Sequence, residues 1–332
     1  MTPDALNAAD DWRPTCSLET LRLRSELLQQ VRQFFLTRDF LEVETPLLSH
    51  DSVIDRHLDP LGVTLFSDPR RPDQGERLWL QTSPEFGMKR LLAAGAEAIF
   101  QIGKAFRGGE TGSRHNVEFT MVEWYRVGDD YAAGRQLLAD LARETLGGAV
   151  EMLTFAAAFE RYVGVNPHTA APSRLIEIAA ERNIALPQSH DPADRDLPLD
   201  MLLTELVEPN LGASGPTIVY DYPASQAALA QVRPGQPPIA ERFELYAGGV
   251  ELANGYHELL DPQRLRARNA TNNQNRQADG KYPLPETSRL LAAMQHGLPA
   301  CSGTALGLDR LLMVRSGAHS LAETLTFPIA RA

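Results

Sequence analysis

The stretch ERFELYAGGVELANGY, residues 241–256, constrains the fold of this chain more than any other segment. Two adjacent glycines, at 248 and 249, stand between two segments that are rich in strand-forming residues. Adjacent glycines accept the backbone conformations that a two-residue hairpin turn requires. The stretch therefore predicts an antiparallel hairpin in which Tyr246 faces Glu251.

The predicted hairpin also places acidic side chains together. Glu244 and Glu251 become diagonal neighbours on one face of the two strands. Two carboxylates at that separation repel each other unless one is protonated or a cation lies between them. Magnesium, with substrate phosphates completing its shell, is the natural cation for such ligands. A solvated acidic hairpin face fits the same pattern. Glu258 follows another glycine, Gly255, and is free to turn toward a different part of the same site.

Residues 106–126, FRGGETGSRHNVEFTMVEWYR, combine charge and aromatic rings around three glycines. The flanking residues predict two strands, 99–106 and 117–125, joined by a glycine-bearing loop. Arg107 stands at the loop entrance, and its planar fork suits phosphate oxygens. A hairpin with cross-strand Arg–Glu pairs and aromatic packing is the alternative. With the two-residue period of a strand, one face carries Phe119, Met121, Glu123 and Tyr125.

Two shorter sequence patterns contain further candidate functional residues. In QTSPEF, Glu85 stands just inside a predicted helix start, where the helix dipole favours a carboxylate. It fits either an ordinary first-turn acid or the partner of an ammonium group. In CSGTALGLDRLLMV, Gly303 and Gly307 permit close backbone approach, and Arg310 opens an apolar helix. A tight strand–helix junction is the structural alternative.

The remaining elements indicate an α+β fold, an antiparallel sheet flanked by helices. Residues 150–215 are expected to form a helical insertion, and residues 262–285, rich in Arg, Asn and Gln, are expected to be exposed. The chain has neither a GxGxxG motif after a first strand nor a GxxxxGK[ST] motif, so no Rossmann or P-loop nucleotide site is indicated. Helical periodicity or punctuation predicts helices over 18–36, 84–95 and 131–146, and residues 217–223 predict a strand.

The composition is that of a water-soluble globular protein, with 43% apolar residues among 332 and a net charge of −11. The acidic balance argues against broad nucleic-acid binding. The compact basic groups 70–71 and 264–268 fit either surface charge or a local nucleic-acid-binding patch.

Membrane-span and secretory-signal patterns are missing from the sequence. Two cysteines without CxxC spacing, Cys16 and Cys301, fit a thiol-keeping compartment, so the expected location is the cytoplasm.

The order of the motifs resembles the catalytic core of class II lysyl-tRNA synthetases. FLEVETP, TSPE, FR with RHNVEFTMVEWY, ERFELYAGGVELANGYHEL and GTALGLDR follow one another along the chain. The resemblance implies an N-terminal tail over 1–17 and a catalytic domain over 18–332. Lysyl-tRNA synthetases also carry an N-terminal OB-fold domain that reads the anticodon. Fewer than 20 residues precede the first predicted helix here, so no such domain is expected.

The chain also resembles the stand-alone elongation factor P–lysine ligases, particularly in PASQAALAQV and GVELANGYHEL. This resemblance implies an enzyme that activates lysine, preferably (R)-β-lysine, with ATP and Mg²⁺, and transfers it to a lysine side chain of elongation factor P. A minimal aminoacylator of tRNA and an inactive synthetase-like regulator are the alternatives. The motif that contains Pro46 implies a homodimer, and tRNA is not an expected partner.

The resemblance implies roles residue by residue. Arg107 and Arg310 would be catalytic, by neutralising phosphate charge. Glu244 and Glu251 would bind Mg²⁺. The ATP-binding residues would be Arg107, His115, Asn116, Phe119, Glu251, Leu252, Gly307 and Arg310, with adenine between Phe119 and Arg310. The amino-acid substrate would contact Ser83, Pro84, Glu85, Tyr125, Asn254 and Glu258.

The chain departs from the family pattern at two places. After Arg107 these families usually have Asn-Glu, whereas this chain has Gly108-Gly109 and a glutamate, Glu110, one place late. The synthetases usually have glycine where this chain has Ala305. The added methyl group would narrow the pocket beside the amino-acid backbone, which suggests an amino group placed differently from that of α-lysine.

Overall fold

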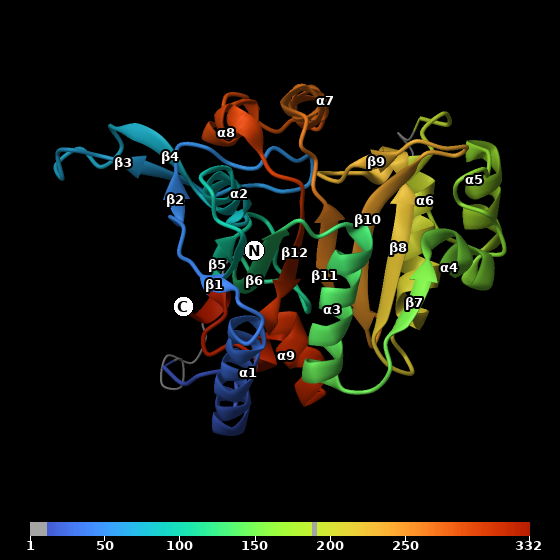
Figure 1. Cartoon of the computed structure of the whole chain (residues 1–332), viewed down its shortest axis with the longest axis horizontal. Coiled ribbons are helices and arrows are strands. Elements are labelled where there is room, and N and C mark those ends of the chain that lie inside the picture. Colours follow the sequence, from blue (N-terminus) through green and yellow to red (C-terminus); the bar gives the residue numbers. More distant parts are fainter. Residues whose placement is uncertain (1–11, 188–190) are drawn as a thin grey trace.

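The computed structural model describes residues 12–187 and 191–332 (Figure 1). These residues form a large sheet flanked by helices and a small separate sheet, which confirms the α+β prediction. The helices are α1 (Leu18–Leu36), α2 (Glu85–Ala93), α3 (Tyr131–Leu146), α4 (Phe155–Tyr162), α5 (Pro172–Glu181), α6 (Asp196–Leu202), α7 (Pro262–Ala278), α8 (Arg289–Gly297) and α9 (Leu308–Ser316). The strands are β1 (Leu41–Glu42), β2 (Leu48–Ser49), β3 (Gly62–Leu65), β4 (Glu76–Leu80), β5 (Ala98–Phe106), β6 (Glu118–Val127), β7 (Glu151–Thr154), β8 (Thr217–Pro223), β9 (Val232–Arg233), β10 (Ile239–Ala247), β11 (Val250–His257) and β12 (Cys301–Gly307).

The large sheet is antiparallel through its centre. Its strand order is β1-β5-β6-β12-β11-β10-β8-β7, with β9 paired to β10. The parallel pairs, β1 with β5 and β7 with β8, lie at its two edges. Helices α1, α3 and α9 pack against one face of the sheet (Figure 1). Phe100 and Trp124 of the sheet pack against Phe35 of α1 there, and Phe243 packs against Tyr131 of α3, so the main core lies on this face.

Two of the predicted helices have the bounds that the sequence indicates. Helix α1 is capped by the side chain of Ser17, which accepts a hydrogen bond from the Thr20 amide at 3.0 Å. Helix α3 is capped in the same way by Asp130. It ends at Gly147, whose φ of 76° lies in the left-handed region that glycine tolerates. Capping residues therefore set the ends of both helices.

Strand β6 divides its side chains between the core and the opposite face. Val122 and Trp124 are buried in the main core. Met121, Glu123 and Tyr125 alternate with them and line a cavity on the other face. The two-residue period thus confirms which side chains share a face, and it places the site on the side of the sheet away from α1, α3 and α9.

The insertion over 150–215 is not purely helical, which corrects the prediction. It begins with β7, and this four-residue strand pairs in parallel with β8. The strand was not predicted because its partner lies more than sixty residues later in the chain. Helix α4 then packs against β7 and β8, α5 packs against α6, and all three helices contribute to a separate core that includes Phe155, Phe159 and Val219.

The expectation that residues 262–285 are exposed is wrong for one face of this segment. Most of it forms α7, and Leu265, Asn269, Asn273 and Arg276 are buried. The composition misleads here because the buried polar groups have partners elsewhere in the chain: Asn273, for example, exchanges hydrogen bonds with the backbone of Leu284 at 2.9 Å.

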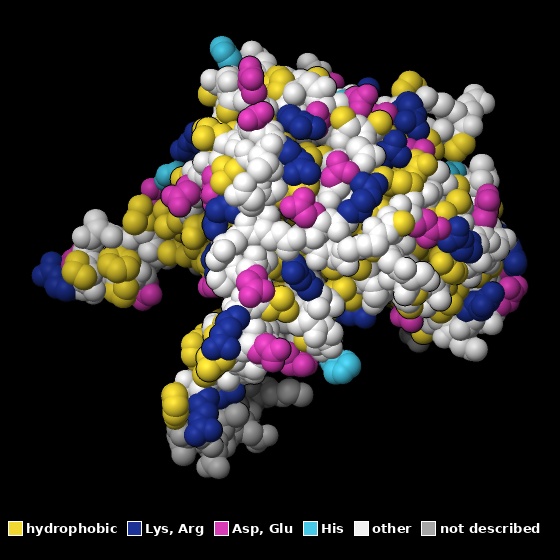
Figure 2. Space-filling view, turned by 60° about the horizontal axis from the view of Figure 1, so that its bottom comes forward, with side chains coloured by type: hydrophobic (Ala, Val, Ile, Leu, Met, Phe, Trp, Pro, Cys, Tyr) yellow, Lys and Arg dark blue, Asp and Glu magenta, His cyan; other side chains and the backbone are white. Residues whose placement is uncertain are grey.

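The small sheet, β2-β4-β3, projects from the body as an arm that carries hydrophobic side chains (Figures 1 and 2). Both cysteines, Cys16 and Cys301, are buried free thiols, as expected. Within the described part of the chain, none of the helices combines the length and apolar character that crossing a membrane requires.

Candidate active site

A cavity of about 1500 Å³ lies on the open face of the sheet. Strands β6, β10, β11 and β12 contribute to its lining, together with α7, residues 53–58 and the insertion. The predicted site residues that line it are Ser83, Glu85, Arg107, His115, Asn116, Phe119, Tyr125, Glu244, Glu251, Leu252, Asn254, Glu258, Gly307 and Arg310. Pro84, between Ser83 and Glu85, is the N-cap residue of α2. The fold therefore brings motifs from distant parts of the sequence into one cavity.

A bulge in the hairpin explains how residues of β11 share this cavity. Tyr246 pairs with Glu251, as predicted, but the register then shifts so that Glu244 pairs with Asn254. In a regular strand, residues 251 and 254 would point to opposite faces. The extra residue of the bulge puts both on the cavity side. Glu258 follows Asn254 by an even number of positions and lines the same cavity.

Glu244 is held firmly in place. It is 4% exposed. The hydroxyls of Tyr222 and Tyr246 each donate a hydrogen bond to Glu244 Oε2 at 2.5 Å. The guanidinium of Arg242 donates to Oε1. Both carboxylate oxygens thus have partners already, so Glu251 is the freer of the two predicted magnesium ligands.

Glu251 lies close to Glu244 and to Arg310, whose Nη1 is 3.6 Å from Glu251 Oε2. Burial, followed by the nearby Glu244, raises the pKa of Glu251 to about 7. Burial and Glu244 also raise the pKa of Glu208, which reaches this place from the insertion, with its Oε1 3.4 Å from the Tyr246 hydroxyl oxygen. Carboxylates perturbed in this way favour a bound cation.

The donor set fits a cation that is shared with a phosphate ligand. Within residues 12–187 and 191–332, no three acidic, histidine or cysteine side chains are placed to hold a metal ion by themselves. Glu251, with Glu244 behind it, would supply carboxylate oxygens, and phosphate oxygens and water would supply the rest. Mg²⁺ is commonly bound in this way.

A second group of carboxylates surrounds Tyr125. Glu85 comes from α2, Glu123 from β6 and Glu258 from the residue after β11. Glu123 accepts hydrogen bonds from the hydroxyls of Tyr125 at 2.5 Å and Ser83 at 2.8 Å. Burial, followed by the charge of Glu85, raises the pKa of Glu123 to about 8. A pocket of this kind suits ammonium groups, since each would relieve the repulsion between the carboxylates.

Ala305 lies in β12 between two of these residues. In the sheet it pairs with Glu123 of β6 on one side and with Asn254 of β11 on the other. Its methyl group also lines the cavity. The departure from glycine therefore lies next to the carboxylate pocket.

Lys89 contacts the carboxylate pocket from behind the cavity wall. It follows Glu85 by one turn of α2, and its Nζ lies 2.5 Å from Glu85 Oε1 and 2.5 Å from Glu258 Oε2. The residue is 2% exposed. Burial acts to lower the pKa of Lys89, but Glu258 and Glu85 outweigh burial and raise it, so the side chain is an ammonium.

Arg107 and Phe119 lie together at the loop between β5 and β6. The guanidinium of Arg107 lies over the Phe119 ring, 5.0 Å from its centroid. Its Nη1 is 3.8 Å from Glu110 Oε1, so the displaced glutamate stays beside the arginine. The predicted phosphate-binding and stacking residues are therefore adjacent, and a ring that stacked on Phe119 would share its surroundings with Arg107.

The structure explains why glycines stand at 108 and 109, where the family usually has other residues. The Gly108 amide donates to the carbonyl of Asp59 at 2.6 Å, and a Cβ on Gly108 would lie only 3.2 Å from that oxygen and from Leu61 Cδ2. Gly109 has a φ of 77°, which favours glycine. The chain at 59–61 thus passes so close to the loop that larger side chains would be strained.

Arg310 approaches the loop from α9. Its Nη2 lies 2.7 Å from His115 Nε2, and its Nη1 donates to the Glu251 carbonyl at 3.0 Å. Burial, followed by the charge of Arg310, lowers the pKa of His115, so this ring is neutral near pH 7. The side chain of Asn116 instead bonds to backbone groups of Glu118 and Ile329.

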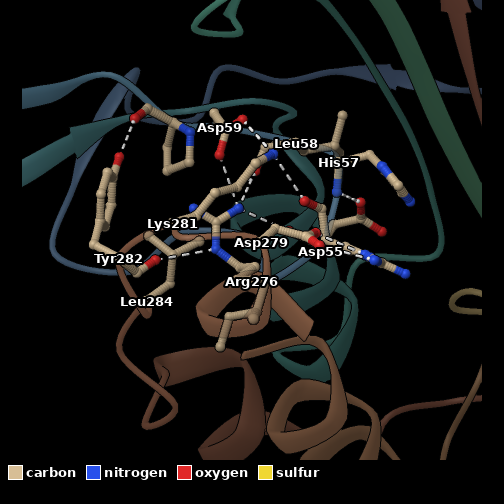
Figure 3. A network of polar contacts seen from close by, with 12 residues as sticks. Asp55, His57, Leu58, Asp59, Arg276, Asp279, Lys281, Tyr282 and Leu284 are labelled. Carbon is tan, nitrogen blue, oxygen red and sulfur yellow. Dashed lines mark hydrogen bonds and ion pairs between the residues drawn. The ribbon is translucent and has the colours of Figure 1, made fainter. Parts of the chain in front are cut away.

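The 53–59 segment, of which residues 53–58 line the cavity, is anchored by Arg276 of α7 (Figure 3). Arg276 is 0% exposed. Its Nη1 donates to the carbonyls of Asp55 at 2.9 Å and Leu58 at 3.0 Å, and it lies 2.9 Å from Asp59 Oδ1. The buried helix face of α7 therefore fixes the segment that also contacts Gly108.

Three residues of the cavity region were not assigned roles from sequence. Glu123 was predicted to share a face with Tyr125, and this alternation was the available signal. Lys89 follows Glu85 by four residues, the spacing of helical neighbours, which is a weak signal. Glu208 has no local signal, because only the folded insertion brings it to Tyr246.

Residues 8–331 match the family model described as "tRNA synthetases class II (D, K and N)". Because this match covers nearly the whole chain and the sheet and cavity carry the predicted motifs, the chain belongs to this family.

Relatives of known name narrow the similarity. The chain is 46% identical over 322 residues to the "Elongation factor P--(R)-beta-lysine ligase" of Vibrio vulnificus (strain YJ016), which covers 96% of this chain and 98% of that protein. It is 44% identical over 331 residues to the protein of the same name from Haemophilus influenzae (strain PittGG), which covers 98% of this chain and 100% of the relative.

Proposed function

We propose that this protein is an ATP-dependent ligase that activates lysine, preferably (R)-β-lysine, and transfers it to a lysine side chain of elongation factor P. The relatives that match nearly the whole chain bear this ligase name. The observation that carries the proposal is the cavity itself: Arg107, Arg310 and Glu251 line it together with the carboxylates Glu85 and Glu258, and Arg310 lies 3.6 Å from Glu251. The cavity thus offers arginines for the negative charge of phosphates and carboxylates for the positive charge of ammonium groups.

ATP would bind at the arginine-bearing part of the cavity. Arg107 would neutralise charge on the α-phosphate, and Phe119 and Arg310 would enclose adenine. Gly307 and Leu252 would allow the nucleotide to approach the sheet, with His115 and Asn116 beside it. Mg²⁺, when bound by Glu251 and Glu244, would screen the negative charge of the phosphates.

The diamino acid would bind at the carboxylate pocket. Glu85, beside Ser83 and Pro84, would receive the amino group near the reacting carboxylate. Glu258 and Tyr125 would receive the distal ammonium, with Glu123 as a further partner. Asn254 would contact the substrate near Ala305.

The reaction proposed has two steps. The lysine carboxylate attacks the α-phosphorus of ATP, pyrophosphate leaves, and an aminoacyl-adenylate forms. The acceptor amine then attacks the acyl carbon, an amide bond forms and AMP leaves. The amine proton passes to the departing phosphate oxygen. This chain contributes positioning and charge neutralisation through Arg107 and Arg310.

The proposal also covers the domain organisation, the oligomeric state and the location of the enzyme. We place the catalytic domain at 18–332, with 150–215 as an insertion, after an N-terminal tail at 1–17 that lies largely outside the described residues. We propose a homodimer that acts in the cytoplasm on elongation factor P without tRNA.

ATP–pyrophosphate exchange with α-lysine and (R)-β-lysine tests the activation step. Exchange above background with either isomer supports the ligase and removes the alternative of an inactive regulator. No exchange with either isomer, by a protein that is folded and binds ATP, would contradict the proposed activity.

A further inference from the structure

We infer that Lys89 is a positioning residue for the diamino acid: it is an internal ammonium behind the cavity wall that keeps Glu85 and Glu258 ionised and aimed at the substrate. This inference rests on the proposed function and deepens it. Lys89 lies 2.5 Å from an oxygen of each carboxylate, while both carboxylates line the cavity. Each glutamate thus has Lys89 on one side and the substrate space on the other.

The charges of the pocket support this role. Glu85, Glu123 and Glu258 together with Lys89 leave two negative charges when all four groups are ionised. The two ammonium groups of a lysine isomer match this charge. Without Lys89 the same carboxylates would repel one another more strongly, and protonation would relieve the repulsion. A protonated carboxyl is a poor partner for an ammonium.

The titratable groups around Lys89 and Glu258 also support this role. Burial raises the pKa of Glu258 to about 7, and Lys89 is the largest influence that opposes this rise. The other titratable groups around the pair come from β6, β11 and β12, and burial raises the pKa of each one: Glu123, Tyr125, Tyr256 and Cys301. These groups are neutral or mostly neutral at pH 7 before substrate binds, so they do not replace the charge of Lys89.

The test compares Lys89→Met with wild type in ATP–pyrophosphate exchange with each lysine isomer between pH 6 and pH 9. Because Lys89 lowers the pKa of Glu258, its loss should move the rise of kcat/KM with pH to more alkaline pH. At pH 7, kcat/KM for the diamino acid should fall about tenfold for each unit by which a required carboxylate is raised. The KM for ATP should stay unchanged.

Lys104→Met is the matched control. Lys104 pairs with Glu118 at 3.0 Å, but this pair is half exposed and lies outside the cavity lining. The control should keep the wild-type pH profile. A Lys89→Met enzyme with the wild-type profile and the wild-type KM for the lysine isomers would overturn the inference while the proposed function stands. Absence of exchange in wild type itself would overturn both.

A second pair of variants covers the case in which Lys89→Met does not fold. Lys89→Met/Glu258→Gln removes the lysine together with one of its carboxylates, which lessens the repulsion left behind. It is compared with Glu258→Gln alone. An alkaline shift of the double variant shows that Lys89 still acts through Glu85, whereas identical pH profiles overturn the inference.

Discussion

Glu123 shows how a single buried side chain sets the chemistry of the cavity. It is 1% exposed and is held by Tyr125 and Ser83. With a pKa of about 8, its carboxyl group is mostly protonated at pH 7 in the empty enzyme. An incoming ammonium favours the ionised form, so substrate binding and loss of this proton are coupled.

This coupling predicts a pH dependence. Because the ionised form binds the ammonium, kcat/KM for the lysine isomers should rise as pH increases through about 8 and fall as pH decreases below it. Glu123→Gln has no such proton to lose and should flatten this part of the profile, at a lower activity. The profile is measured by ATP–pyrophosphate exchange. A variant with the full wild-type rise near pH 8 would assign the proton to another group.

Glu258→Gln should weaken binding of the lysine isomers more than binding of ATP. The amide removes the charge partner of an ammonium and also one of the two ion pairs of Lys89. A hydrogen bond to a charged group contributes about 1.5–3 kcal/mol, which corresponds to roughly a 10- to 150-fold loss of affinity. Calorimetry with each ligand measures both affinities. Equal losses for lysine and ATP would show that the assigned role is wrong.

At the level of residues, the motifs predicted which side chains meet but not how they are arranged. The alternation along β6 predicted the shared face of Phe119 and Tyr125. The bulge that turns both Glu251 and Asn254 to the cavity was not predicted, because the hairpin turn alone indicates a regular register. The role of Lys89 could not be predicted, because its partner Glu258 is far away in the sequence and meets it only in the folded chain.

Among the elements, α7 and the 53–59 segment form one unit on the cavity wall. The unit depends on long-range contacts between Arg276 and backbone carbonyls (Figure 3). Sequence composition could not predict this, since an Arg- and Asn-rich helix usually has little to bury. In contrast, the bounds of α1 and α3 were predictable because their caps are local.

Arg276→Met should destabilise the fold. The substitution removes a buried charge that satisfies two carbonyls and Asp59, with an expected loss of about 3 kcal/mol of unfolding free energy. Chemical denaturation measures the loss. Arg266→Met, at an exposed position of the same helix, is the control and should change stability by less than about 0.5 kcal/mol. Similar effects of the two substitutions would contradict the anchoring role.

Gly109→Ala should disturb the loop that carries Arg107. Its φ of 77° costs a residue with a Cβ about 1–2 kcal/mol. Weaker ATP binding is expected, because the loop positions Arg107, and isothermal titration measures it. Gly112→Ala, in the same loop with open space around its Cβ, is the control. If Gly109→Ala binds ATP as tightly as this control, the glycine is not needed for the loop conformation.

For the whole molecule, exposed leucines mark one edge of the sheet as a candidate dimer interface. Leu41 of β1 is 63% exposed, and Leu18 and Leu36 at the ends of α1 are 68% and 48% exposed. Leu41 lies five residues before Pro46, and the resemblance assigns the motif that contains Pro46 to the dimer interface. Large apolar groups left in water often belong to an interface.

Leu41→Glu should therefore shift the protein toward monomers, since a buried carboxylate without a partner is costly. Light scattering at several concentrations measures the mass. Met152→Glu is the control, because Met152 is 38% exposed on β7 at the opposite edge of the sheet. A wild-type protein that is monomeric throughout would contradict the proposed homodimer.

The central claim concerns the acceptor, and the intact mass of elongation factor P tests it most directly. Purified elongation factor P is incubated with this protein, ATP, Mg²⁺ and either α-lysine or (R)-β-lysine, and parallel reactions contain tRNA. The account predicts that elongation factor P gains the mass of one lysyl group, at a lysine side chain, with (R)-β-lysine preferred. Labelled tRNA together with unmodified elongation factor P would contradict it.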